Sequence, residues 1–140
     1  MRGKGLPTGE AARGDLIATV SIQVPVQLTQ EQKDLYQECY EMLYGGISMI
    51  KDGATDHDVL TKWPDSPEYW GFKDWAEVMP YAVGHGLGLT LHDPPGISAY
   101  AKAMGMPPVA LKEGMVLALE TYAGHKGGKH GVRLEEDVLV

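Results

Sequence analysis

Apolar residues recur every three or four positions between residues 30 and 51, which is the period of an amphipathic helix. The intervening positions are mostly charged or polar, so one face of this helix is suited to packing and the other to solvent. The pattern therefore predicts a helix over residues 30–51. The residues of its apolar face are Leu35, Tyr36, Cys39, Leu43, Ile47 and Ile50.

The ends of this helix are marked by its flanking residues. Thr29 followed by Gln32 has the capping-box spacing, which satisfies two free backbone N–H groups at a helix start. Gly53 suits the end of the helix. The Gly45-Gly46 pair lies inside it and indicates close packing or a bend, because glycine costs about 1 kcal/mol relative to alanine there. Thr55 predicts the cap of a short second helix.

Alternating and continuous apolar runs predict strands elsewhere. Residues 15–28 alternate toward their end, which favours a strand, and Pro25 places it at an edge or a bend. From Gly114 onward the pattern again becomes that of β-structure. We expect strands over residues 115–122 and 132–140, joined by a loop.

Two further segments carry no clean period. Residues 63–80 hold all three tryptophans between prolines, and they predict loop and short helix, partly buried by the aromatic rings. Residues 94–108 are rich in proline and predict an irregular segment that covers another part of the molecule. Residues 1–14 are rich in glycine and predict a flexible lead-in to a single domain over residues 15–140.

Composition narrows the classes of function. The chain has 140 residues, 44% of them hydrophobic and 22% charged, which is typical of a globular domain. Its net charge of −7 argues against nucleic acid as a partner. A single cysteine, Cys39, excludes an internal disulfide and fits a reducing compartment. Because no apolar run approaches the roughly 20 residues of a membrane span, we expect a cytoplasmic protein with no membrane partner.

Two glutamates near the end of the chain form a candidate pair. If the hairpin is symmetric about Gly127-Gly128, Glu120 lies directly opposite Glu135 on the same face of the sheet. Two like charges at that distance destabilise the sheet unless a proton or cation lies between them. A divalent metal would remove this conflict. The alternative is an asymmetric hairpin in which both glutamates point to water.

The segment from Gly84 to Pro94 supplies two histidines, His85 and His92, among several glycines. The glycines allow the backbone to approach a buried polar site closely. His92 has the chemistry of an acid, a base or a donor to an oxyanion, and Asp93 either orients it or begins a turn. A lone histidine is more often structural than functional, so this segment alone leaves both readings open. The remaining histidines are assigned to surface loops: His57, His125 and His130.

Three motifs, taken together, resemble the pita-bread metallopeptidases. They are Gly84-His85-Gly86-Leu87-Gly88 followed by His92-Asp93-Pro94, then Leu119-Glu120, then Gly131-Val132-Arg133-Leu134-Glu135. This superfamily includes methionine aminopeptidase, aminopeptidase P, prolidase and the non-peptidase creatinase. The resemblance implies an α+β pita-bread fold, here truncated, in which a curved and mostly antiparallel sheet has helices packed on one face.

The resemblance also implies roles for individual residues. His85, Glu120 and Glu135 match the metal ligands of the family, and Glu120 is also the candidate for activating the attacking water. His92 matches the catalytic histidine, close enough to the scissile bond to contact substrate. Arg133 lies in a context similar to that of the proline-specific and creatinase-like branches, and it is expected to bind substrate. Glu136 beside Glu135 leaves a small ambiguity in the ligand assignment.

One family element is missing. The family supplies two aspartate ligands from a hairpin that precedes the first long helix, yet no aspartate lies between Asp15 and Asp34. Asp93 also stands where the family usually has glutamate. Because the two aspartate ligands are missing, we expect one ion at most, Mn²⁺, Co²⁺ or Zn²⁺, in place of a dinuclear centre.

Three hypotheses follow for the function. The first is a metal-dependent hydrolase of the Xaa-Pro peptidase type with impaired activity, acting on a peptide or small amide. The second is an inactive binding scaffold of the same fold, or a creatinase-like non-peptidase. The third is a fragment or deletion product. Loss of the hairpin also exposes a sheet edge, so a homodimer is a further hypothesis.

Overall fold

A computed structural model describes the chain except for residues 1, 3, 9–12, 18–25 and 79–82. The strand predicted within residues 15–28 falls largely on residues 18–25 and so lies outside the described residues. None of the helices in the described part of the chain is long and apolar enough to cross a membrane.

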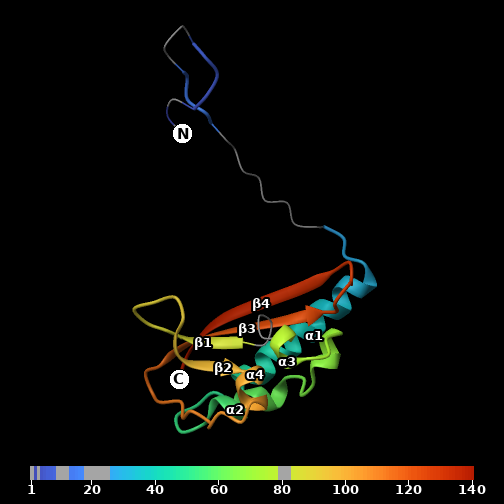
Figure 1. The fold of residues 1–140 in the computed structure, drawn as a ribbon, viewed down its shortest axis with the longest axis vertical. Helices are drawn as coiled ribbons and strands as arrows, with labels where there is room; N and C mark the ends of the chain where they lie inside the picture. Colours follow the sequence, from blue (N-terminus) through green and yellow to red (C-terminus); the bar gives the residue numbers. More distant parts are fainter. Residues whose placement is uncertain (1, 3, 9–12, 18–25, 79–82) are drawn as a thin grey trace.

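The described residues form a four-stranded antiparallel sheet with the strand order β2-β1-β3-β4. Figure 1 shows β3 and β4 as a long hairpin beside the shorter β1 and β2. The strands expected over residues 115–122 and 132–140 are confirmed as β3 and β4. The bounds are β1 Val83–Leu87, β2 Asp93–Ser98, β3 Val116–Gly124 and β4 Gly131–Leu139.

The long helix α1, Gln30–Ile47, begins at the predicted cap. The Thr29 side chain accepts from the Gln32 backbone N–H at 3.2 Å, and the Gln32 side chain accepts from the Thr29 N–H at 3.0 Å. The helix ends before the expected residue 51, with Ser48 as its C-cap, and Gly53 instead occupies a following turn with φ of +80°. The second predicted cap is also confirmed, because Thr55 caps α2, Asp56–Val59.

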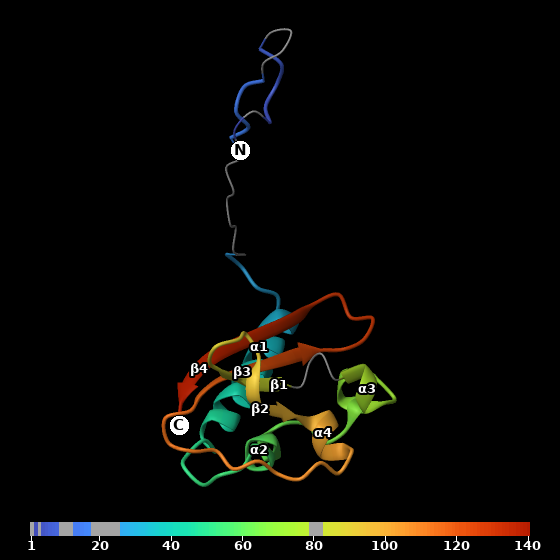
Figure 2. The ribbon, with the colours of Figure 1, turned by 60° about the vertical axis from the view of Figure 1, so that its left-hand side comes forward.

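Helix α1 covers one face of β3 and β4 (Figures 1 and 2). Cys39 and Leu43 are buried against this face, and the Cys39 Sγ lies 3.3 Å from the Thr121 Oγ1. A Cβ placed on Gly46 would lie 3.1 Å from the Trp63 Nε1 and 3.2 Å from the Leu119 Cδ2. The glycine pair therefore marks close packing, which is one of the two alternatives that the sequence left open.

Short helical elements gather around β2 and the buried tryptophans. Trp70 is 2% exposed and donates its Nε1 proton to the Tyr122 carbonyl at 3.0 Å, so the predicted burial of the aromatic segment is confirmed. Figure 2 shows α2, α3 and α4 on the side away from β4. Their bounds, with the two 3₁₀ turns, are η1 Leu60–Lys62, η2 Pro67–Trp70, α3 Trp75–Val78 and α4 Ala99–Ala103.

The prediction of an irregular segment over residues 94–108 was wrong in its first half. Residues 93–98 form β2, and α4 follows it, with the Ser98 side chain accepting from the Ala101 N–H at 3.3 Å. β2 is an edge strand, and an edge tolerates Pro94 and Pro95 because it leaves one row of backbone N–H positions without a ladder partner. Edge position is a property of the sheet, which local sequence does not reveal.

The symmetric hairpin is confirmed. β3 and β4 pair in the register that places Glu120 opposite Glu135, and the pairing continues to Gly124 opposite Gly131. β1 pairs with the other side of β3, with Val83 opposite Glu120. This antiparallel sheet with α1 on one face is the α+β architecture that the sequence predicted.

Candidate metal centre

His85 is carried by β1 and packs closely against β3. Its Cα lies opposite that of Ala118, and a Cβ on the preceding Gly84 would lie only 2.9 Å from the Ala118 carbonyl oxygen. Glycine at this position therefore allows β1 to approach β3, as the sequence predicted. The His85 side chain is nearly buried, and its Nδ1 lies 3.1 Å from the Gly86 carbonyl oxygen. This contact leaves Nε2 to point toward β3.

Glu120 on β3 meets His85 from the neighbouring strand. The Glu120 side chain is 12% exposed, and its Oε1 lies 3.1 Å from the His85 Nε2. Its second oxygen, Oε2, forms an ion pair with the guanidinium of Arg133 on β4. A carboxylate this buried needs such partners, because desolvation penalises an unpaired charge. Glu120 is thus the central group of the site, contacted from both adjacent strands.

His92 approaches from the segment that joins β1 to β2. Its ring lies 4.4 Å from that of His85, centroid to centroid, in an edge-to-face arrangement with an interplanar angle of 83°. Asp93, the next residue, accepts hydrogen bonds from the hydroxyl and the backbone N–H of Thr90. These bonds lower the pKa of Asp93. Asp93 therefore fixes the turn that precedes β2 and begins that strand, whereas the sequence had it begin a turn or orient His92.

The ligand atoms of His85, His92 and Glu120 all lie within 4.8 Å of one another. Two imidazoles and one carboxylate suit a borderline divalent ion such as Zn²⁺. The 3.1 Å between the His85 Nε2 and the Glu120 Oε1 is close to the about 3.3 Å that separates two ligands on a tetrahedral zinc with bonds of about 2.0 Å. The residues present therefore fit one metal ion.

Of the other residues expected at the site, Arg133 and His92 reach it, and Glu135 is not part of the cluster. Glu135 lies opposite Glu120 in the strand pairing, but its side chain is exposed, and it is not part of the three-residue cluster. Arg133 does reach the site, through Glu120. His92 joins the cluster as a third ligand candidate, whereas the resemblance implied catalysis and substrate contact for it. The loop that brings His92 onto His85 has no hydrophobic period in the sequence, so the pattern could not predict this contact.

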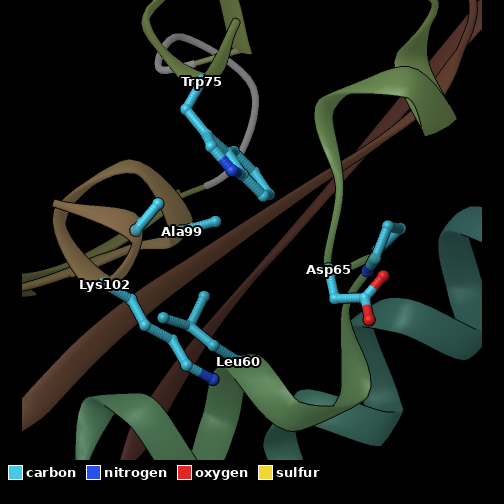
Figure 3. Close-up of a pocket in the computed structure, with 7 residues that line it drawn as sticks. Leu60, Asp65, Trp75, Ala99 and Lys102 are labelled. Carbon is cyan, nitrogen blue, oxygen red and sulfur yellow. The ribbon is translucent and has the colours of Figure 1, made fainter. Parts of the chain in front are cut away.

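A separate cavity shares no lining residue with this cluster. It has a volume of about 250 Å³ and is lined mainly by apolar side chains, including Leu60, Trp75 and Ala99. Figure 3 shows the Trp75 indole and the Lys102 side chain entering it from different elements, with Asp65 beside it. None of its lining residues is a histidine, a cysteine or a glutamate. The histidine cluster, and not this cavity, therefore carries the candidate chemistry.

The antiparallel sheet with helices defines the class of the protein as a truncated pita-bread domain. The sequence pattern of metallopeptidase family M24 matches residues 10–140, so the chain belongs to this family.

Individual relatives agree with this assignment. The chain is 32% identical to methionine aminopeptidase of Archaeoglobus fulgidus over 125 residues, which are 89% of this chain and 38% of the relative. It is 28% identical to Xaa-Pro dipeptidase of Pyrococcus furiosus over 128 residues, 90% of this chain and 32% of the relative. The solved prolidase from Pyrococcus furiosus superposes with a TM-score of 0.62 at 26% identity, covering 82% of this chain and 31% of that one. The chain spans about a third of the length of these relatives.

Proposed function

We propose that this domain binds one divalent metal ion through His85, His92 and Glu120 and acts in metal-dependent hydrolysis of a peptide or small amide. The observation that carries the proposal is the convergence of these three ligand atoms within 4.8 Å, from β1, the segment after it, and β3. A divalent ion in this place would supply a bound water of lowered pKa and a Lewis acid for the substrate carbonyl. An Xaa-Pro peptide is the finer proposal for the substrate.

The residues around the cluster have distinct proposed tasks. Glu120, held by His85 on one oxygen and Arg133 on the other, is positioned to accept a proton from the attacking water. His92 is exposed, so its imidazole is accessible to substrate as well as to metal. The Arg133 side chain is 47% exposed, and its remaining N–H donors suit a substrate carboxylate.

The ion pair between Arg133 and Glu120 favours a second candidate function. A guanidinium already supplies a positive charge beside Glu120, so this carboxylate does not need a metal ion to balance its charge. In this alternative the domain keeps the site geometry without turnover.

Calorimetric titration with Mn²⁺, Co²⁺ and Zn²⁺ tests the two candidates. For the hydrolase we expect binding in the micromolar range or tighter. Glu120→Gln removes the ligand charge with little change in shape, and it should weaken binding by more than the about 10–100-fold typical of outer-shell changes. Glu136→Gln is the matched control, because Glu136 lies on the adjacent strand and contacts Tyr44 instead of the cluster.

Metal-loaded protein should then hydrolyse an Xaa-Pro dipeptide, with His92→Asn and Arg133→Met reducing turnover or raising KM. Folded protein that binds none of the three ions would exclude the hydrolase and leave the scaffold. Metal binding without hydrolysis of any peptide tested would place the chain among inactive family members.

A further inference from the structure

β4 forms one edge of the sheet and is long. It spans nine residues and pairs with β3 on one side, and within the described residues no strand pairs with its other side. Such an edge presents a row of backbone N–H and C=O groups to any strand that can align with it. The side chains around the edge therefore decide which strand can align with it.

Helix α1 extends a row of tyrosines alongside this edge. Tyr36, Tyr40 and Tyr44 recur every four residues and remain 48%, 42% and 42% exposed. The Tyr44 hydroxyl donates to the Glu136 Oε1 at 3.2 Å, and Tyr36 shares a surface pocket with Val132. Tyr36 to Tyr44 covers about 12 Å of helix, and Val132 to Glu136 covers about 13 Å of strand, so the two rows run side by side. A strand added to β4 would place one face against these rings.

The charges on β4 select a second copy of β4 in antiparallel orientation. Glu135, Glu136 and Asp137 are exposed, and in a parallel in-register pair each would face its own like charge. In the antiparallel pair centred on Glu135, all nine residues of β4 find partners. Arg133 of each copy then faces Asp137 of the other, so this opposite-charge pair occurs twice. Val132 then faces Val138 on the tyrosine side. The only like-charge pair is Glu135 with its own copy, at the two-fold axis.

From this geometry we propose that the outer edge of β4, with the tyrosine row of α1, is the interface of a symmetric homodimer. Two sheets of four strands join there into one sheet, and the two-fold axis passes at Glu135. The interface closes on itself, so pairing stops at two copies.

The dimer would also reach the candidate metal centre. Arg133 has five N–H donors, enough to contact Glu120 of its own chain and Asp137 of the second copy. Sharing the guanidinium in this way weakens its hold on Glu120. A weaker ion pair would leave Glu120 more available to a metal ion. This consequence rests on the proposed function, whereas the dimer itself does not.

Sedimentation of the metal-free chain tests the dimer without reference to activity. We expect a concentration-dependent monomer–dimer equilibrium and no larger species. Arg133→Asp and Asp137→Arg should each weaken the dimer, and the double variant should restore it. Lys102→Asp makes the same change of charge on α4, on the side of the molecule away from β4, and should leave the equilibrium unchanged. Far-UV circular dichroism checks that each variant is folded.

Disulfide trapping tests the register. Cys39 is buried, so a disulfide between two copies would form through the newly introduced surface cysteine. Glu135→Cys lies on the proposed axis and should form a disulfide-linked dimer when diamide is added as oxidant, while Glu136→Cys should not. A monomer at every soluble concentration would overturn the dimer. A dimer that is insensitive to the charge exchange and is not trapped at residue 135 would overturn this interface.

Discussion

At the scale of single residues, Glu120 determines what the site can do. Its side chain is nearly buried, and its two oxygens contact a histidine on one strand and an arginine on the other. The same carboxylate is therefore both a candidate metal ligand and half of an ion pair. A metal ion at the cluster and Arg133 would compete for it electrostatically, because both are cations beside the same carboxylate.

Replacing Arg133 with methionine removes the competing cation while keeping an unbranched side chain. Because the guanidinium is half-exposed, the ion pair is worth no more than about 1 kcal/mol. We expect Arg133→Met to tighten divalent metal binding by about two- to fivefold in calorimetry, with Lys129→Met as the control. Weaker metal binding in the variant would show that Arg133 positions Glu120 instead of competing for it.

At the scale of elements, the packing of α1 on β3 holds the sheet that carries the site. Leu117 and Leu119 on β3 are fully buried, and they alternate with Ala118 and Glu120 on the opposite face. The face against α1 is therefore apolar, and the other face presents the carboxylate.

Gly46 is the position where this contact is closest. Alanine there gains about 1 kcal/mol of helix propensity, but its Cβ would crowd Trp63 and Leu119, and overpacking costs about 1–3 kcal/mol. We expect Gly46→Ala to lower the free energy of unfolding by about 1 kcal/mol in urea denaturation. Gly45→Ala is the control, since its Cβ would meet only the Lys62 side chain within 4 Å. Equal stability of the two variants would contradict close packing at Gly46.

At the scale of the whole molecule, the site joins segments that are distant in the chain. His85 and His92 come from the first sheet hairpin and its connection, and Glu120 comes from the second hairpin. These contacts exist only in the folded state. A metal ion that binds the cluster therefore binds folded protein in preference to unfolded protein, and it must stabilise the fold.

Thermal unfolding should report this coupling. At a free metal concentration of 100 times Kd, binding adds about 2.7 kcal/mol, which raises the Tm of a domain of this size by about 10 °C. A chelator should reverse the shift. Glu120→Gln should show a much smaller one. A Tm that does not depend on metal, in protein that is shown to be folded, would argue for the scaffold function.

Much of the fold could be predicted because it is encoded locally. Thr29 and Thr55 satisfy free N–H groups within three residues, so both helix starts followed from short motifs. The turn at Gly127-Gly128 fixed the register of the hairpin, and with it the pairing of Glu120 with Glu135. The strand β2 was missed because prolines exclude a central strand but not an edge, and only the complete sheet shows which strands are edges.

The candidate site, like the fold, could be predicted only in part. The sequence by itself determined which residues have metal-binding chemistry, His85, Glu120 and Glu135 among them, because residue type and motif order are local properties. Tertiary structure decided which of them meet. It placed the His92 ring against that of His85 through an aperiodic loop, paired Glu120 with Arg133, and left Glu135 exposed. The physical reason is that strand register fixes Cα positions, whereas side-chain contacts depend on the neighbouring strands and loops that share a face.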